Sequence, residues 1–385
     1  MGEKVLVINT GSTSHKYAVY DNSRLILSFH FETNGDKFIL NSISEKGKEV
    51  EEIPGDIFFS SLKYVRENTR DIKIDYIVVR VVAPGIFFSK DRIFDEEYLS
   101  KLKKIESRDP LHISPTIELY KNIVSIFTGI KVIGISDSSF HFDENRELKI
   151  YPLPYEDTEK FELYRYGYHG ISIGSVVRKM KEEKSLSEKV IICHLGGGSS
   201  ISAILEGKSI ENSMGYSPLE GLMMATRTGN IDSMALLVLQ EEKGLSISQI
   251  KNYLYKECGM KGVSGLSSDT RVLLEAEKDG GERGARASRA LQLYIQKIKK
   301  EIGSQIAILN GVDTLVFTGT IGERSSIMRE RICTDLEYLG IHLDLIKNKN
   351  NESENFNIEI ENSPVKIKVI HTEEEKEMAY KASLI

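Results

Sequence analysis

Two glycine-rich turns are the first segments of the chain that could bind an anion. Residues 9–16 (NTGSTSHK) follow an apolar, β-branched run, and residues 194–199 (HLGGGS) follow a second such run in the other half of the chain. Each turn leads into a run that alternates apolar with polar residues, which predicts a β-hairpin. Glycine admits positive φ and close approach of backbone N–H groups, while Ser and Thr hydroxyls add donors. Both hairpins are therefore candidate phosphate-binding turns.

Two arginines are candidate anion ligands, because a guanidinium can pair with a carboxylate or phosphate through two parallel hydrogen bonds. Arg80 lies in the apolar run 75–82, which predicts a strand covered on both faces, and a structural ion pair is its alternative role. Arg227 lies in residues 211–232, a run of glycines, hydroxyls and methionines that is too apolar for a solvated loop. This run is interpreted as a ligand-facing wall, with a buried connection as the alternative.

Asp137 and His169 are candidate catalytic residues. Asp137 follows the strand pattern 131–136, and active sites of open α/β sheets lie beyond the carboxyl ends of strands. Magnesium prefers one or two carboxylates together with phosphates, so Asp137 is a candidate ligand, although it could instead cap the next segment. His169 stands between glycines ahead of the helical pattern 172–181. A lone histidine is usually structural, so both roles stay open for His169.

Two further segments carry weaker signals. The strand pattern 314–318 runs into the glycine turn 319–324, which suits a nucleotide but occurs in many α/β proteins. The strand pattern 365–370 precedes an acidic helix over residues 373–382. A terminal charge run is usually a solvated face, yet a carboxylate in the first turn of this helix could also reach a metal.

Composition limits the classes of function. The chain has 385 residues, a formal net charge of −6 and interspersed acids and bases, which argues against a nucleic-acid partner. No apolar run reaches the roughly 18 residues of a membrane span, and residues 1–4 lead directly into a strand pattern, so we expect a cytoplasmic protein without a membrane partner. Cys193, Cys258 and Cys333 lack metal-type spacing and are expected to be reduced thiols, with Cys193 as a core residue pointing away from its turn.

The length predicts at least two domains, and the repeated hairpin predicts an internal duplication with one phosphate-binding turn in each half. Strand and helix patterns alternate along the chain, which predicts an α/β fold. The stiff segment 151–154 (YPLP) is the candidate boundary between the halves.

Five motifs, in order along nearly the whole chain, resemble those of the acetate kinase family. Residues 9–16 are similar to the family's N-x-G-S-S-S-x-K, and residues 166–170 (YGYHG) to its Y-G-F-H-G. Residues 194–199 resemble H-L-G-N-G-S, and residues 317–323 (FTGTIGE) resemble F-T-G-G-I-G-E. Residues 214–232 (MGYSPLEGLMMATRTGNID) match a longer family block.

The resemblance implies two duplicated ribonuclease H-like domains of the actin, sugar-kinase and heat-shock ATPase superfold, with an interdomain cleft. It implies an acyl, phosphate and magnesium domain over residues 1–150 with 372–385, and a nucleotide domain over residues 151–371. The implied reaction is reversible transfer of the γ-phosphoryl group of ATP to a short carboxylate, giving acyl phosphate and ADP, with Mg²⁺ or Mn²⁺. The resemblance also implies a homodimer.

The resemblance implies site residues position by position. Arg80 and Arg227 would hold the carboxylate and the transferring phosphoryl group, His169 would donate to that group, and Asn9, Asp137 and Glu374 would hold the metal. The residues implied along the phosphates are Asn9, Ser12, Ser14, Lys16, His194, Leu195, Gly196, Gly197 and Gly198. Those implied around the nucleoside are Asp269, Thr270, Arg271, Gly319, Thr320, Ile321, Gly322, Glu323 and Arg324. Those implied for the substrate pocket are Arg80, Val82, Leu111, Tyr168 and Pro218.

The chain departs from the family pattern near the acyl-binding residues and in the nucleoside turn. Residues 83–85 read APG where HGG is usual, residues 113–114 read IS where NP is usual, and residues 171–173 read ISI where TSH is usual. Thr320 and Arg324 replace a glycine and an asparagine. The match of residues 213–232 to the family block makes acetate the first expected acid and propionate the second, while the departures leave the identity of the acid open. The alternatives are butyrate, another phosphoryl donor such as pyrophosphate, or a nucleotide-binding sensor without turnover.

Overall fold

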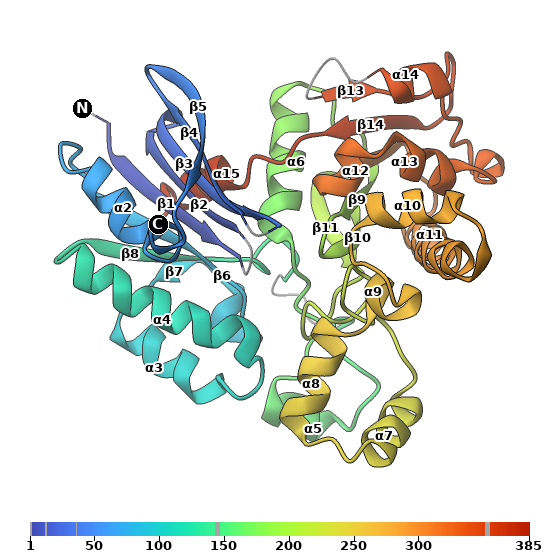
Figure 1. The fold of residues 1–385 in the computed structure, drawn as a ribbon, viewed down its shortest axis with the longest axis horizontal. Helices are drawn as coiled ribbons and strands as arrows, with labels where there is room; N and C mark the ends of the chain where they lie inside the picture. The colour runs from blue at the N-terminus through green and yellow to red at the C-terminus, as the bar shows by residue number, and fades with distance from the viewer. Residues whose placement is uncertain (1, 12–13, 36, 143–146, 351–354) are drawn as a thin grey trace. The chain divides into compact units, whose positions relative to one another are not determined.

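A computed structural model describes residues 2–11, 14–35, 37–142, 147–350 and 355–385. The chain forms two compact units: unit 1 comprises Met1–Ser139 and Glu373–Ile385, and unit 2 comprises Phe140–Thr372. Each unit has one mixed β-sheet with helices (Figure 1). The predicted α/β class is confirmed. The predicted division into an acyl side and a nucleotide side stays a prediction.

Unit 1 contains an eight-stranded sheet in the order β5-β4-β3-β2-β1-β6-β8-β7. Its strands are β1 (Lys4–Thr10), β2 (Ser14–Asp21), β3 (Arg24–Asn34), β4 (Lys37–Ser44), β5 (Gly47–Ile53), β6 (Tyr76–Val81), β7 (Arg92–Ile93) and β8 (Lys131–Ser136). Its helices are α1 (Gly55–Phe59), α2 (Ser61–Asn68), the 3₁₀ turn η1 (Ile86–Ser89), α3 (Glu96–Ile105), α4 (Pro110–Ile126) and α15 (Glu374–Ala382).

Unit 2 contains a six-stranded sheet in the order β11-β10-β9-β12-β14-β13. Its strands are β9 (Lys189–Leu195), β10 (Ser199–Leu205), β11 (Lys208–Asn212), β12 (Thr314–Thr318), β13 (Asn355–Asn357) and β14 (Lys366–Ile370). Its helices are α5 (Tyr155–Phe161), α6 (Gly170–Glu182), α7 (Ser233–Glu242), α8 (Ile247–Lys256), α9 (Gly259–Ser264), α10 (Thr270–Lys278), α11 (Gly281–Leu309), α12 (Gly319–Arg324), α13 (Ser326–Cys333), η2 (Glu337–Leu339) and α14 (Leu345–Lys349).

The two sheets share one strand order. In unit 1 the antiparallel strands β3, β2 and β1 are followed by β6 and β8, which run parallel to β1. In unit 2 the antiparallel strands β11, β10 and β9 are followed by β12 and β14, which run parallel to β9. The β1–β2 and β9–β10 hairpins thus occupy equivalent positions, in agreement with the duplication that their sequences predict.

Side-chain alternation decides which strand residues of unit 1 reach polar partners. Leu6 and Ile8 of β1 and Val79 of β6 point into a core that includes residues of α2, α3 and α4. Because successive strand residues point to opposite faces, Asn9 and Arg80 lie on the other face. Helix α15 contacts that sheet through β1, β2, β6 and β8. The last helix of the chain therefore meets the polar residues of the first sheet.

The same alternation operates in unit 2. Cys193 and Leu195 of β9 point into a core with α10, α11 and α13, so the prediction for Cys193 is confirmed. Val190 and Ile192 point to the opposite face, where they pack with residues of α6. His194 has the same parity as Ile192 and lies on the α6 side.

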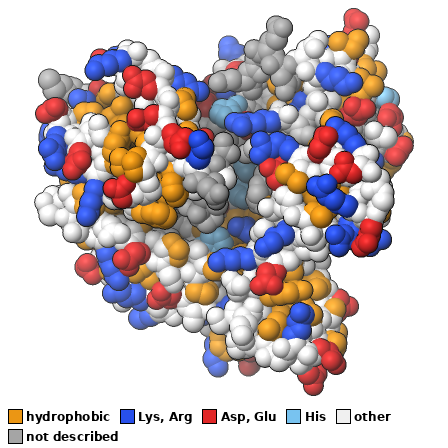
Figure 2. Space-filling view, in the orientation of Figure 1, with side chains coloured by type: hydrophobic (Ala, Val, Ile, Leu, Met, Phe, Trp, Pro, Cys, Tyr) orange, Lys and Arg blue, Asp and Glu red, His pale blue; other side chains and the backbone are white. Residues whose placement is uncertain are grey.

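The charges on the drawn face of the molecule are mixed, as they are along the sequence. On the face drawn in Figure 2, Lys and Arg side chains are interspersed with Asp and Glu side chains. No helix in the described part of the chain combines the length and the apolar composition that a membrane crossing requires.

Candidate active site

Arg80 lies between two carboxylates in unit 1. Its Nη2 donates to Asp137 Oδ2 over 2.9 Å, and its Nη1 lies 3.9 Å from Glu374 Oε2. Burial opposes the charge of the guanidinium, but Asp137 and Glu374 raise the pKa of Arg80 above its ordinary value. Asp137 is almost fully buried at the carboxyl end of β8, as the sequence predicts for this position.

Asn9 and Lys16 join this cluster through the first turn of α15. The Asn9 amide nitrogen donates to Glu374 over 2.8 Å and to Glu375 over 2.9 Å. Lys16 Nζ lies 3.6 Å from Glu375. Burial lowers the pKa of Lys16, and the neighbouring Glu375 and Glu374 outweigh this effect and raise it. One cluster thus gathers residues of β1, β2, β6 and α15 with the residue that follows β8.

This cluster fits magnesium by the chemistry of its donors. Asp137 and Glu374 supply carboxylate oxygens and Asn9 an amide oxygen, which are the hard ligands that Mg²⁺ prefers. Among the described residues, no group of three His, Cys, Asp or Glu side chains has the geometry of a metal site. Mg²⁺ usually takes only one or two carboxylates and keeps waters and phosphate oxygens as its other ligands, so two carboxylates suffice.

His169 lies beside the second hairpin of unit 2. It precedes α6 in a left-handed conformation with φ of 60°, and its Nδ1 lies 3.0 Å from the Ser200 hydroxyl. Its ring centroid is 4.4 Å from that of His194. A Cβ atom placed on Gly198 would lie only 3.0 Å from His169 Nε2. Glycine at position 198 therefore leaves room for the imidazole next to the turn.

Arg227 reaches the same turn from the irregular segment 213–232. Its Nη1 donates to the Pro218 carbonyl over 3.1 Å, and its guanidinium lies 5.4 Å from the centre of the Tyr255 ring. The same Nη1 would be 3.7 Å from a Cβ on Gly198. The backbone N–H of Ala225 donates to the Gly197 carbonyl over 3.3 Å, which joins the segment to the turn.

The backbone of Arg227 is fixed by α9. The N–H groups of Met260 and Lys261, in the first turn of that helix, donate to the Met224 and Ala225 carbonyls. Gly259 has φ of +64°, and a Cβ there would lie 2.2 Å from the Met224 carbonyl oxygen and 2.9 Å from Arg227 N. Only glycine allows this approach of helix to loop.

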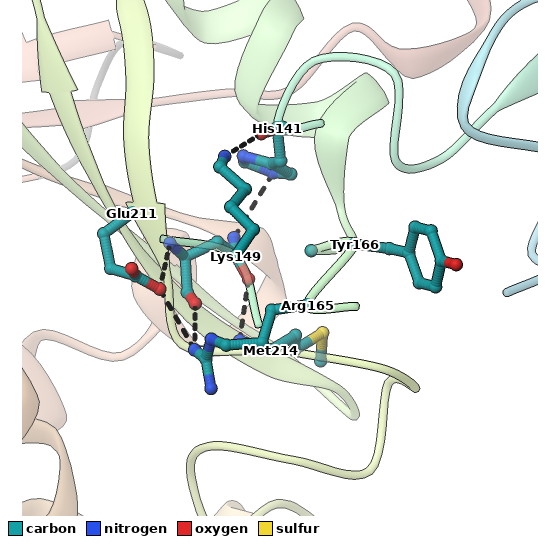
Figure 3. Close-up of a pocket in the computed structure, with 8 residues that line it drawn as sticks. His141, Lys149, Arg165, Tyr166, Glu211 and Met214 are labelled. Atoms are coloured by element: carbon teal, nitrogen blue, oxygen red, sulfur yellow. Dashed lines mark hydrogen bonds and ion pairs between the residues drawn. The ribbon is translucent and has the colours of Figure 1, made fainter. Parts of the chain in front are cut away.

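A polar network supports the segment that ends in His169 (Figure 3). Arg165 Nη2 donates to Glu211 and to the Asn212 carbonyl, each over 3.0 Å, and Arg165 also pairs with Glu220. Asn212 in turn donates to the Tyr168 carbonyl over 3.3 Å. The network lines a cavity of about 10 Å³, which is room for one water and not for a nucleotide.

The predicted nucleoside turn adjoins the second hairpin. Gly319 has φ of +77°, and a Cβ there would lie 2.7 Å from the Leu195 carbonyl oxygen. Glu323 accepts from Gly319 N over 2.9 Å and lies 2.7 Å from His371 Nδ1. Although burial opposes it, the bond to His371 lowers the pKa of Glu323. Residues 319–324, predicted as a turn, form the short helix α12, whose N-terminus lies at the carboxyl end of β12.

Arg329 stabilises α12 through hydrogen bonds to its last carbonyl groups. This fully buried residue donates to the carbonyls of Gly322 and Glu323 and to the side chain and carbonyl of Asn348, over 2.7–2.9 Å. Burial lowers the pKa of Arg329 to about 10, which leaves the guanidinium charged at neutral pH. Its charge is stabilised by oxygen dipoles at the end of α12.

The remaining predicted residues are placed without a test of their roles. Ser14 begins β2, Ser12 lies outside the described residues, and Asp269 caps α10 by accepting from Arg271 N. The substrate-pocket residues are divided, with Val82 and Leu111 in unit 1 and Tyr168 and Pro218 in unit 2. Thr270, Thr320, Ile321 and Arg324 belong to the first turns of α10 or to α12.

Most departures from the family pattern are internal to a unit. Ala83 and Ile113 pack in the core of unit 1, and Ile171 and Ile173 are fully buried at the start of α6. By contrast, Thr320 and Arg324 are exposed.

Three residues with clear roles in these clusters were not predicted. Glu375 shares Asn9 with Glu374, Ser200 orients His169, and Arg329 supports α12. The family resemblance pointed to Glu374 alone, although both glutamates accept from Asn9. A polar residue with the strand parity of His194 was a signal for Ser200. Arg329 carried none, because an arginine in a short helix is usually exposed.

Comparison with known proteins places these clusters in context. Residues 4–380 match the sequence model of the Acetokinase family. The acetate kinase of Thermoanaerobacter pseudethanolicus is 38% identical over 98% of this chain and 97% of that protein, and the acetate kinase of Bacteroides thetaiotaomicron is 36% identical over 97% and 96%. The crystal structure of Porphyromonas gingivalis acetate kinase superposes with a TM-score of 0.83 at 32% identity and covers 100% of both chains. The crystal structure of a propionate kinase from Francisella tularensis superposes with a TM-score of 0.86 at 32% identity and covers 98% of both chains.

Gly259→Ala tests whether α9 fixes Arg227. We expect turnover to fall roughly 10²-fold, because a small displacement of a positioning group has that effect. We also expect the free energy of unfolding to fall by about 1–3 kcal/mol more than in Gly244→Ala, because of overpacking. Gly244 is the matched control: its φ is +60°, but a Cβ there meets no atom of the described chain within 4 Å. Steady-state kinetics and urea denaturation measure both effects, and equal losses in the two variants would contradict this role.

Proposed function

The chain belongs to the acetokinase family and is a carboxyl-group phosphotransferase of the acetate kinase type, and we propose that it transfers the γ-phosphoryl group of ATP reversibly to acetate. A carboxylate oxygen of acetate forms a bond to the γ-phosphorus. The bond from that phosphorus to the bridging oxygen breaks, and the electron pair leaves with ADP. A carboxylate carries no proton to remove, so the reaction needs no general base.

Charge and position supply the rate in this proposal, because both reactants are anions. We assign Arg80 to the acetate carboxylate and Arg227 to the phosphoryl group in flight. The observation that carries the proposal is the cluster of Arg80 with Asp137, Glu374 and Asn9, which unites one phosphate-binding hairpin with two carboxylates. A structural ion pair alone would not need the second carboxylate or the amide.

His169 is assigned as a donor to an equatorial phosphoryl oxygen. We assign the Ser200 hydroxyl as donor to Nδ1, which would place the ring proton on Nε2, the nitrogen nearest Gly198. The backbone N–H groups of the turn 196–198 would take the phosphates that stay on the nucleotide. The α12 turn and the N-terminus of α10 would take the nucleoside.

Magnesium would be held by Asp137 and Glu374, with Asn9 beside them. When bound, Mg²⁺ or Mn²⁺ would offset negative charge on the phosphate oxygens. Lys16 would add a point charge near the same phosphates, since its pKa is raised and it stays protonated at neutral pH.

Acetate is proposed ahead of longer acids because each of the three departing segments near the acyl-binding residues places a side chain, Ala83, Ile113 or Ile173, in the core of a unit. The exposed Thr320 and Arg324 keep a second phosphoryl donor as the alternative, because both stand in the predicted nucleoside turn.

A screen of acids and donors tests the activity. Hydroxamate trapping of acyl phosphate is measured with Mg²⁺, with formate to valerate as acceptors and with ATP, GTP or pyrophosphate as donors. We expect ATP with acetate to give the highest kcat/KM and propionate to follow. If the protein binds nucleotide but no combination of acid and donor gives acyl phosphate, the kinase assignment is wrong and a nucleotide-binding sensor is favoured.

Arg227→Ala tests the role of the second guanidinium. We expect kcat to fall by roughly 10³-fold, because a charge aimed at the transferring phosphoryl group is lost, while ADP binding is largely kept. Arg283→Ala is the control, since Arg283 is an exposed residue of α11 that pairs with Asp279. Kinetics and calorimetric titration with ADP measure the two effects. An unchanged kcat would remove Arg227 from the mechanism.

A homodimer is proposed on the evidence of α7. None of the residues of α7 is buried, and its apolar residues Met234, Leu237 and Val238 are 64%, 54% and 53% exposed. An apolar helix without a partner in its own unit is typical of an interface. A second copy of the chain is the proposed occupant.

Leu237→Glu tests this interface. We expect sedimentation velocity to show the mass of two chains for the unchanged protein and of one chain for the variant, because a charge would be buried in the interface. Val50→Glu is the control, because Val50 is also exposed but lies on β5 of unit 1. If the variant still sediments as a dimer, the interface does not involve α7.

A further inference from the structure

Lys381 forms a buried polar contact near the end of α15. Its side chain is only 15% exposed, and its Nζ lies 3.0 Å from Asp91 Oδ2. Nζ also donates to the Ser139 hydroxyl over 2.6 Å. Lys121, by contrast, pairs with Glu118 on the surface, where its side chain is 54% exposed. Lysines are rarely buried without a structural or functional reason.

The other oxygen of Asp91 holds the segment around Asp137. Asp91 Oδ1 accepts from the backbone N–H of Ser136 over 2.8 Å and lies 3.1 Å from the Ser139 hydroxyl. These contacts are made one residue before Asp137 and two residues after it. One carboxylate therefore fixes the loop that presents Asp137.

Lys381 connects that loop to the opposite end of α15. Glu374 and Lys381 are seven residues apart, which is about two helical turns, so both side chains lie on one face of the helix. That face meets the sheet, where Glu374 binds Asn9 and Lys381 binds Asp91. A helix of two and a half turns is stiff, so fixing one end restricts the other.

We propose that Lys381 is a positioning residue that sets the spacing of the Asp137 and Glu374 carboxylates for a divalent cation. The inference rests on the proposed function, in which these two residues hold magnesium. Mg²⁺ tolerates little departure from octahedral geometry, so the spacing of its protein ligands governs its affinity. Through Asp91, Lys381 connects helix α15, which carries Glu374, to the segment that carries Asp137.

The test compares Lys381→Met with Lys121→Met, the same change at an exposed residue of α4 in the same unit. Binding of Mn²⁺ alone to the full chain is measured by electron paramagnetic resonance. Half-saturating Mg²⁺ and the KM for acetate are measured by kinetics. We expect Lys381→Met to weaken Mn²⁺ binding about tenfold or more, as loss of a supporting contact does at metal sites. The acetate KM stays unchanged, and Lys381→Arg restores most of the affinity.

Asp137→Asn separates this inference from the function on which it rests. If Asp137→Asn does not weaken Mn²⁺ binding, the proposed metal site itself is wrong. If it does, but Lys381→Met binds Mn²⁺ as Lys121→Met does, Lys381 only anchors the helix and the positioning role is overturned. Should Lys381→Met not fold, Asp91→Asn keeps an acceptor for Ser136 N while losing the ion pair, and the same comparison of Mn²⁺ affinity applies.

Discussion

The balance of charge around Arg80 is the constraint on which unit 1 depends. A guanidinium removed from bulk water needs anionic partners, and Asp137 and Glu374 supply them. These residues are far apart in sequence, so the last helix must return to the first sheet before the cluster exists. With Lys16 and Glu375 included, these five side chains comprise three acids and two bases. The surplus negative charge is what a divalent cation would balance.

The two copies of the hairpin make different contacts because they carry different residues at equivalent positions of their sheets. In unit 1 the hairpin presents Asn9 and Lys16, whose side chains bind the start of α15. In unit 2 the hairpin presents glycines, and the side chains of His169 and Arg227 approach the turn from other segments. A Cβ at Gly198 would meet His169, so the loss of side chains from the second turn is what admits the imidazole. The shared strand order gives the two hairpins equivalent positions, and the differences in sequence give their turns different contacts.

Local patterns in the sequence were enough to predict the α/β class, the hairpins and the polar residues at strand ends. Asp137 was predictable because an apolar run ended in a carboxylate, and the alternation of β1 and β6 explains why Asn9 and Arg80 share a face. Contacts made across long separations were not predictable. Nothing near Lys381 in sequence indicates Asp91, and Arg329 meets α12 only through tertiary folding.

A reaction between two anions is favoured by cations with fixed positions, and the two arginines are positioned by different contacts. Arg80 is fixed by carboxylates, which orient it and also neutralise it. Arg227 donates to the Pro218 carbonyl oxygen, and its guanidinium lies over the Tyr255 ring. Charge stabilisation of a phosphoryl group is strongest from a cation that is held in place before the reaction. In the proposed reaction both guanidiniums would therefore be oriented before the substrates arrive, Arg80 for the carboxylate and Arg227 for the phosphoryl group.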